Sequence, residues 1–213
     1  MDIREETKIP NKKVLQAEAS KAELIRVAAE LFAERGYSGT TLDGVAKQAG
    51  LTKGGLYHHF RDKLELFEAV AAVSIHNEIQ RVSTESRRMT LNTDMNSWER
   101  LIAMVDLLLD GFLDPQVRRI VWVDGPSVLG WERWHDVVSV PTLGQINLIF
   151  DVFARYGIVK DSLRRPLAQL FFGSVQEAGM SIAHAADPEA KRAELAPALH
   201  WMLSELFGGQ RES

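Results

Sequence analysis

Two short apolar segments joined by a glycine turn constrain the fold of this chain more than any other feature. A threonine pair, Thr40–Thr41, precedes a segment whose apolar residues recur at helical spacing and which ends at Gly50. Thr52 precedes a second segment, in which Leu56 and Phe60 lie four residues apart. Threonine is a good N-cap residue, and apolar residues four apart share one helix face. The pattern therefore predicts a helix-turn-helix.

The flanking sequence predicts one helix before this motif and one after it. Ser20, with Glu23 three residues on, has the pattern of a capping box at a helix start. Gly36 supplies the positive-φ residue that ends such a helix. Asp62 can cap a long fourth helix that runs to about Arg88.

The rest of the chain continues mainly as helical segments. Asp114 followed by Pro115 is the pattern of an N-cap with proline at the first helical position. Arg118–Asp124 favours a strand on propensity alone, and Gly125–Pro126 interrupts it. We expect Pro141 to kink the helix that contains it. The predicted helices are 98–112, 130–155, 163–184 and 189–207. Gly157 ends the second of them, and Gly208–Gly209 ends the last. The expected fold class is all-α.

Composition excludes several classes of protein. The 213 residues include no cysteine, which excludes disulfide scaffolds and thiolate metal sites. No apolar stretch approaches the ~20 residues of a membrane span, and the charged start lacks a signal peptide. We expect a soluble cytoplasmic protein without membrane contact. The net charge is −4, but residues 1–66 carry eleven Lys and Arg against ten Asp and Glu. A basic segment on an acidic body suits a chain in which one small part meets a polyanion.

The sequence divides into three parts. We interpret residues 1–19 as a flexible extension, 20–66 as the helix-turn-helix domain and 67–213 as a second helical domain. Cations of the extension that could touch DNA backbone are Arg4, Lys8, Lys12 and Lys13. The neighbouring Asp2, Glu5 and Glu6 dilute that charge, which favours a solvated tail.

The second short helix of the motif carries groups suited to DNA. With Leu56 and Phe60 facing inward, Lys53, Tyr57 and His58 share an exposed surface. Glycines at 54 and 55 allow close backbone approach to phosphates. Tyrosine and imidazole can donate to phosphates or touch base edges. His59 has an equally good alternative role in packing or capping, and a metal site at 58–59 is disfavoured because neighbouring helical residues diverge by about 100°.

Residues Ser20–Phe67 resemble the DNA-binding domain of TetR-family transcriptional regulators, and the string AAELFAERGYSGTTLDGVAKQAGLTKGGLYHHFRDKLELF, residues 28–67, carries the resemblance. The resemblance implies an all-helical homodimer with a C-terminal ligand-sensing domain and effector-controlled release from an operator, usually as a repressor. It also implies DNA contacts at matching positions, several of them through the backbone. These positions are Thr41, Thr52, Lys53, Gly54, Gly55, Tyr57, His58, His59 and Lys63.

The C-terminal part is rich in large apolar side chains, and all five tryptophans lie there. Such groups can line a cavity between helices, although aromatic residues at helical spacing are more often ordinary core. We predict effector contacts at Trp122, Trp131, Trp134 and His135. Further candidate polar anchors are Asp124, Gln145, Asn147 and Gln176.

By the resemblance, the last two helices form a two-fold dimer interface. The alternative is that they only cover the core of one protomer. Two recognition helices about 34–36 Å apart, or a multiple of that, would match a palindromic operator.

Two other classes of function fit the sequence less well. An all-helical enzyme would need a nucleophile, phosphate-loop or metal signature, and none is present. A helical interaction protein would not need the outward Lys53, Tyr57 and His58. We therefore predict a DNA-binding repressor without metal or cofactor, released from a palindromic operator by a small apolar or aromatic effector. An activator, or a regulator without an effector, remains an alternative.

Overall fold

The computed structural model describes residues 11–91, 94–155 and 157–207, which form helices and connecting turns with no strand among them. This confirms the predicted all-α class. The α-helices are α1 Lys12–Gly39, α2 Leu42–Gln48, α3 Lys53–His59, α4 Lys63–Leu91, α5 Ser97–Gly111, α6 Pro115–Val117, α7 Gly125–Leu129, α8 Trp131–Trp134, α9 Val140–Arg155, α10 Arg164–His184 and α11 Pro188–Phe207. Two π-helical segments, η1 Arg118–Asp124 and η2 His135–Ser139, and a 3-10 turn, η3 Asp161–Leu163, complete them.

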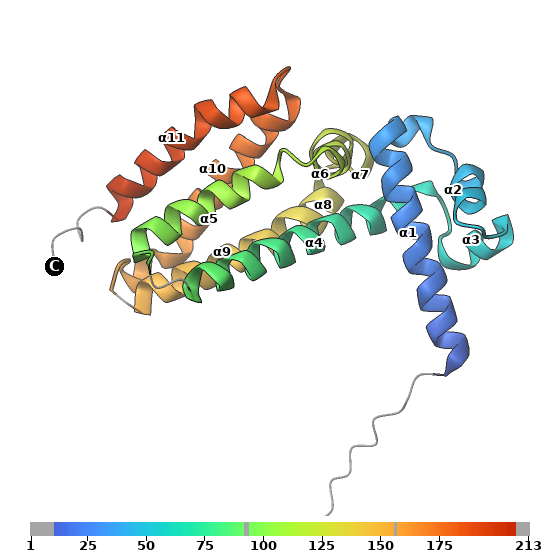
Figure 1. The fold of residues 1–213 in the computed structure, drawn as a ribbon, viewed down its shortest axis with the longest axis horizontal. Coiled ribbons are helices and arrows are strands. Elements are labelled where there is room, and N and C mark those ends of the chain that lie inside the picture. The colour runs from blue at the N-terminus through green and yellow to red at the C-terminus, as the bar shows by residue number, and fades with distance from the viewer. Residues whose placement is uncertain (1–10, 92–93, 156, 208–213) are drawn as a thin grey trace, which may run out of the picture.

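The helices form two regions that share α4 (Figure 1). Helices α1–α3 lie at one end of the molecule, and α4 runs from them into a bundle with α5, α9, α10 and α11. The segment α6–η1–α7 lies beside α1, so the bundle contacts the N-terminal helices through it as well as through α4.

The predicted caps of the short helices are confirmed. Thr41 Oγ1 accepts from the Gly44 N–H and Thr52 Oγ1 from the Gly55 N–H, each at 3.1 Å. Asp62 Oδ1 accepts from the Glu65 N–H at 2.8 Å, at the start of α4. Each cap satisfies a backbone donor that the first helical turn leaves unpaired.

The predicted start of the first helix is wrong. Helix α1 begins at Lys12, with Asn11 as its N-cap. Ser20 lies inside the helix and donates from Oγ to the Gln16 carbonyl, while the Glu23 carboxylate pairs with Arg26. A serine hydroxyl can bond back to the preceding turn as readily as it caps. The rest of the predicted extension, Met1–Pro10, lies outside the described residues, as does the predicted stop at Gly208–Gly209.

Gly36 has a φ of 71°, as predicted for the end of the helix, although the turn continues to Gly39. At such a positive φ a side chain is strained. A Cβ there would also collide with the guanidinium of Arg119. Glycine at this position therefore lets η1 approach α1.

The strand favoured for Arg118–Asp124 is wrong, because the segment is π-helical. Its residues Ile120, Val121 and Trp122 are all buried, and it packs against α1, α4 and α10. Three consecutive buried residues suit either a strand or a helix that is surrounded on most sides. Gly125–Pro126 continues the helical path into α7 instead of interrupting it.

Residues Trp131–Arg155 form one long helical stretch, with the π-helical η2 just before Pro141. Proline lacks the N–H that would continue the regular i to i−4 pattern of hydrogen bonds. This stretch is long and apolar enough to cross a membrane, so the expectation that no segment approaches that length was wrong. Ile146 and Phe150 of this stretch are nonetheless buried in the bundle.

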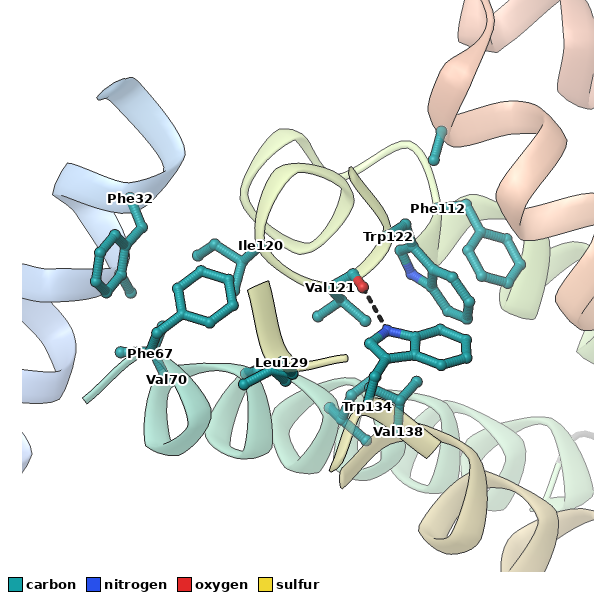
Figure 2. Close-up of a cluster of buried hydrophobic side chains, with 14 of the residues drawn as sticks. Phe32, Phe67, Val70, Phe112, Ile120, Val121, Trp122, Leu129, Trp134 and Val138 are labelled. Atoms are coloured by element: carbon teal, nitrogen blue, oxygen red, sulfur yellow. Dashed lines mark hydrogen bonds between the residues drawn. The ribbon is translucent and has the colours of Figure 1, made fainter. Parts of the chain in front are cut away.

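One continuous core joins the two regions (Figure 2). Phe32 and Phe67 pack edge to face at 5.0 Å between ring centroids, at the junction of α1 and α4. Further along, Trp122 packs edge to face against Trp134, whose Nε1 donates to the Val121 carbonyl at 2.7 Å. The indole therefore buries its ring without leaving its polar atom unpaired.

Candidate nucleic-acid interface and effector cavity

Helix α3 presents one face to the core and the other to solvent. Leu56 and Phe60 are buried against α1 and its neighbours, whereas Tyr57 is 46% exposed. Lys53 and His58 are exposed beside it. The predicted division of this helix into an inner and an outer face is confirmed, and the outer face exposes a cation, a phenol and an imidazole to solvent.

Lys53 is held by an acidic neighbour from α2. Its ammonium lies 2.9 Å from a carboxylate oxygen of Asp43, and this contact raises the pKa of Lys53. Both side chains are well exposed, so the pair itself adds little stability. Its effect is to orient the lysine across the gap between α2 and α3.

The hydroxyls of Thr41 and Thr52 accept from backbone donors at the starts of α2 and α3. A hydroxyl that accepts in this way keeps its own O–H to donate. The neighbouring threonine has a different role that the sequence did not reveal. Thr40 is buried, and its Oγ1 lies 3.1 Å from the Leu31 carbonyl and 2.9 Å from that of Gly36, which fixes the turn between α1 and α2.

The two histidines at the end of α3 differ in environment. His58 is exposed, whereas His59 is half-buried, and their rings lie 5.3 Å apart. Burial, with smaller contributions from His58 and Lys21, lowers the pKa of His59. The lowered pKa favours the neutral form of the His59 ring at pH 7.

Lys63 is partly engaged inside the protein. Its ammonium donates to the carbonyls of Tyr37 at 2.9 Å and Thr40 at 3.1 Å, and it lies 4.2 Å from the centroid of the Tyr37 ring. The ammonium has three donors, so one remains beyond these two bonds. Lys63 therefore ties the start of α4 to the α1–α2 turn, a role that its charge alone did not indicate.

A cavity of about 80 Å³ lies inside the helical bundle. Apolar side chains from α4, α5, α6, η1, α9 and α10 form most of its wall. A few polar groups interrupt the wall, among them Gln145 and Gln176. The residues that line it are Ile75, Glu78, Ile79, Val82, Ser83, Met104, Leu108, Gly111, Phe112, Val117, Trp122, Thr142, Gln145, Ile146, Ile149, Phe172, Val175 and Gln176.

The rings of the four predicted effector residues contact one another in a row, but the four residues do not line one cavity together. Trp122 lines the cavity. Trp134 is buried in the adjoining core, 5.6 Å from Trp122 between ring centroids, and does not line it. Trp131 is 65% exposed and sits with His135 on the outer surface. The row of rings therefore runs from the cavity wall through the core to the surface, and of the four residues only Trp122 lines the cavity.

Asp124, a candidate anchor, faces the N-terminal helices instead. Its carboxylate accepts from the Tyr37 N–H at 2.9 Å and from Arg119 Nε at 3.2 Å. The same segment, Pro115–Asp124, contributes Val117 and Trp122 to the cavity wall. One short stretch of chain therefore touches both the cavity and the end of α1.

Helices α10 and α11 have both buried and exposed apolar residues. Most of their large apolar side chains cover the bundle core, including Phe171, Phe172, Val175, Ile182, Leu199 and Leu203. Leu170 and Trp201 are 69% and 64% exposed, and Met202 is exposed beside Trp201. Packing against the bundle core explains the apolar residues on the inner faces of α10 and α11. It does not explain the exposed Leu170, Trp201 and Met202.

Two family models match this chain. The model described as bacterial regulatory proteins of the tetR family matches residues 24–70, which include α2 and α3. The model described as the tetracyclin repressor-like C-terminal domain matches residues 98–206, about half of the chain. Together they cover the predicted recognition helix, much of the cavity wall and both α10 and α11.

Individual relatives agree with the family models. The chain is 31% identical over 147 residues to the HTH-type transcriptional activator FasR of Mycolicibacterium smegmatis, an alignment that covers 66% of this chain and 62% of FasR. It is 28% identical over 127 residues to the transposon Tn10 TetC protein of Escherichia coli, covering 59% and 61%. The chain thus aligns with about three fifths of the length of these curated relatives.

A solved TetR-family regulator from Pectobacterium atrosepticum superposes with a TM-score of 0.76 at 29% identity, covering 93% of this chain and 98% of that one. These relatives are regulators and not enzymes. The chain belongs to the TetR family of bacterial regulatory proteins.

Proposed function

We propose that this protein is a homodimeric transcriptional regulator that binds a palindromic operator through α3 and leaves it when a small apolar or aromatic effector enters the cavity. The observation that carries the proposal is the outward face of α3, where Lys53, Tyr57 and His58 are exposed while Leu56 and Phe60 are buried. Family members are in general soluble and cytoplasmic, and we propose the same location here.

The proposed DNA contacts are Thr41, Thr52, Lys53, Gly54, Gly55, Tyr57, His58, His59 and Lys63. The threonine hydroxyls and the third donor of Lys63 suit phosphates, and the exposed Tyr57 and His58 suit base edges or phosphates. We propose that the helix-turn-helix domain spans residues 20–66, which begin within α1 and end near the start of α4.

Selection from random duplexes tests this function directly. The full chain is incubated with a random duplex pool, and the bound DNA is sequenced. We expect an enriched inverted repeat whose half-sites are one or more helical turns apart, bound with an affinity that falls steeply with salt. A pool without an enriched palindrome would instead favour an interaction protein.

For the dimer, we propose that the exposed apolar residues of α10 and α11 pack against the same residues of a second copy. Leu170 and Trp201 are exposed apolar residues on the two helices that the family resemblance assigns to the dimer interface, and contact with a second copy would bury them. Leu170→Glu/Trp201→Glu should sediment as a monomer. Leu91→Glu, at an equally exposed position on α4, is the control and should leave the dimer intact.

For the effector, the apolar wall of the cavity favours a ligand with an apolar or aromatic body. Because Trp122 lines the cavity, its fluorescence should change when a ligand binds there. We expect a ligand from a metabolite panel to change tryptophan fluorescence and to lower DNA affinity, and Trp122→Phe to reduce the fluorescence change. Trp131→Phe, which alters an exposed indole away from the cavity, should retain it.

A role as an activator is the second candidate, because the relative FasR is named as an activator. A reporter gene behind the selected operator separates the two. Expression that rises on deletion of the regulator supports a repressor, and expression that falls supports an activator.

A further inference from the structure

Helix α1 begins well before its first buried residue, so its first turns extend beyond the packed helix-turn-helix domain. Its first residue to be fully buried is Leu24, yet the helix starts twelve residues earlier, at Lys12. Lys12 and Lys13 are exposed, and Ala17 and Ser20 are only half-buried. More than two turns of helix therefore project beyond the packed domain.

The projecting turns begin where α1 crosses the end of α3. Lys21 Nζ lies 5.7 Å from the ring centroid of Phe60, the residue that follows α3. Residues 13, 17 and 21 lie four apart and so share one helix face. At 1.5 Å per residue, Lys13 lies about 12 Å along the helix from Lys21. The helix face that meets the end of the recognition helix thus continues outward and carries a lysine.

The direction of this projection follows from the arrangement of the helices. In Figure 1 the start of α1 points away from α10 and α11, which lie on the opposite side of the molecule. If α10 and α11 meet the second protomer, as the proposed function has it, the two copies of α1 point away from the two-fold axis. On a palindromic duplex they would lie toward its outer ends.

The charge of these turns fits a polyanion. Lys12, Lys13 and Lys21 stand against a single acid, Glu18, between Asn11 and Lys21. Among the described residues, none of the three lysines has an ion-pair partner within 4 Å. Because the segment is helical, the backbone fixes the face from which each lysine projects, unlike the solvated tail that the sequence alone favoured.

We propose that the first turns of α1 are a second DNA contact, in which Lys12 and Lys13 bind phosphates that flank the outer end of each half-site. This inference rests on the proposed function and deepens it. About 12 Å corresponds to three or four base pairs at 3.4 Å each, so each protomer should cover that much DNA beyond the contacts of α3. These contacts should add affinity that does not depend on the flanking sequence.

The test compares Lys12→Ala/Lys13→Ala with the unaltered full chain on the selected operator. One duplex ends at the half-sites, and another carries six additional base pairs of arbitrary sequence on each side. We expect the flanks to tighten binding of the unaltered protein at least severalfold and the double variant to lose that gain. The slope of log K against log salt should fall by about 0.9 for each lysine removed. The control, Arg87→Ala/Lys160→Ala, removes two exposed cations from the bundle and should keep the flank effect.

Other outcomes overturn the inference. If the flanks tighten binding of the Lys12→Ala/Lys13→Ala variant as much as that of the unaltered protein, α1 makes no contact with the flanking DNA. The same conclusion follows if the control variant loses the flank effect to the same extent. A change in sedimentation without a change in DNA affinity would assign the segment to protein contacts, for which Val14 and Leu15 are exposed. Failure of the unaltered protein to bind any duplex would contradict the proposed function itself, which distinguishes the two failures.

Discussion

Asp124 and Tyr37 join the cavity-lining segment to the end of α1. The Asp124 carboxylate accepts from the Tyr37 N–H at 2.9 Å, although the two residues are 87 positions apart. Asp124 lies two residues after Trp122, which lines the cavity. Tyr37 comes directly after Gly36, where α1 turns. This hydrogen bond therefore connects the segment that lines the cavity to the N-terminal helices.

We expect Asp124→Ala to weaken the link between the two regions. Removing a charged acceptor from a mostly buried N–H costs about 1.5–3 kcal/mol, so thermal unfolding should begin at a lower temperature. The same change should also reduce the effect of a bound effector on DNA affinity. Asp136→Ala, at an exposed carboxylate whose one ion-pair contact is His135 at 3.7 Å, is the matched control. Equal unfolding temperatures for the two variants would refute the structural role of Asp124.

Gly125→Ala tests the close packing of the aromatic core. A Cβ at this position would lie 2.9 Å from Cδ1 of Trp134 and 3.0 Å from the Ile120 carbonyl oxygen. Overpacking of this kind costs about 1–3 kcal/mol. Gly144→Ala, in α9, where a Cβ would meet nothing within 4 Å, should be neutral or slightly stabilising. Denaturant unfolding of both variants measures the difference.

DNA affinity should depend on pH through His59. Burial holds the pKa of His59 below its ordinary value, so the ring is largely neutral at pH 7 in the free protein. Nearby phosphates favour the charged ring, so the complex takes up a proton and affinity rises as pH falls from 8 toward 5.5.

The same lowered pKa has the opposite effect on folding. The unfolded chain binds a proton at His59 more readily than the folded one does, so stability falls as pH drops below the unfolded pKa. His59→Gln should flatten both dependences. Titrations at several pH values, by fluorescence anisotropy for binding and by denaturant for folding, measure them. A binding profile that is unchanged in His59→Gln would place His59 away from the phosphates.

The local features of the N-terminal domain could be predicted because they depend on few residues. Thr41, Thr52 and Asp62 each cap a helix through a contact within three residues, and Leu56 and Phe60 share a face through helical geometry alone. The start of α1 was missed because Ser20 and Glu23 have alternative partners in the helix, which a local pattern does not reveal.

The cavity could not be predicted in detail because its wall is a property of packing. Trp122, Trp131 and Trp134 are alike in sequence, yet one lines the cavity, one faces solvent and one fills the core. Trp122 lies within the π-helical η1, whereas Trp131 and Trp134 lie in α8, and which of them meets the cavity depends on how these segments pack against the bundle. The role of Lys63 as an internal link likewise depends on carbonyls more than twenty residues away.

The central claim is that the outward face of α3 binds the operator while its inward face holds the domain together. Leu56→Ala and Tyr57→Ala alter neighbouring residues on opposite faces, so they separate the two roles. Leu56→Ala should cost about 2–5 kcal/mol of stability, whereas Tyr57→Ala should change it by no more than about 0.5 kcal/mol.

An anisotropy titration of the selected operator with Tyr57→Ala and Lys53→Ala is the most direct measurement. Both folded variants should bind at least tenfold more weakly than the unaltered protein, with the slope of log K against log salt reduced in Lys53→Ala. Unchanged affinity in both variants would contradict the central claim.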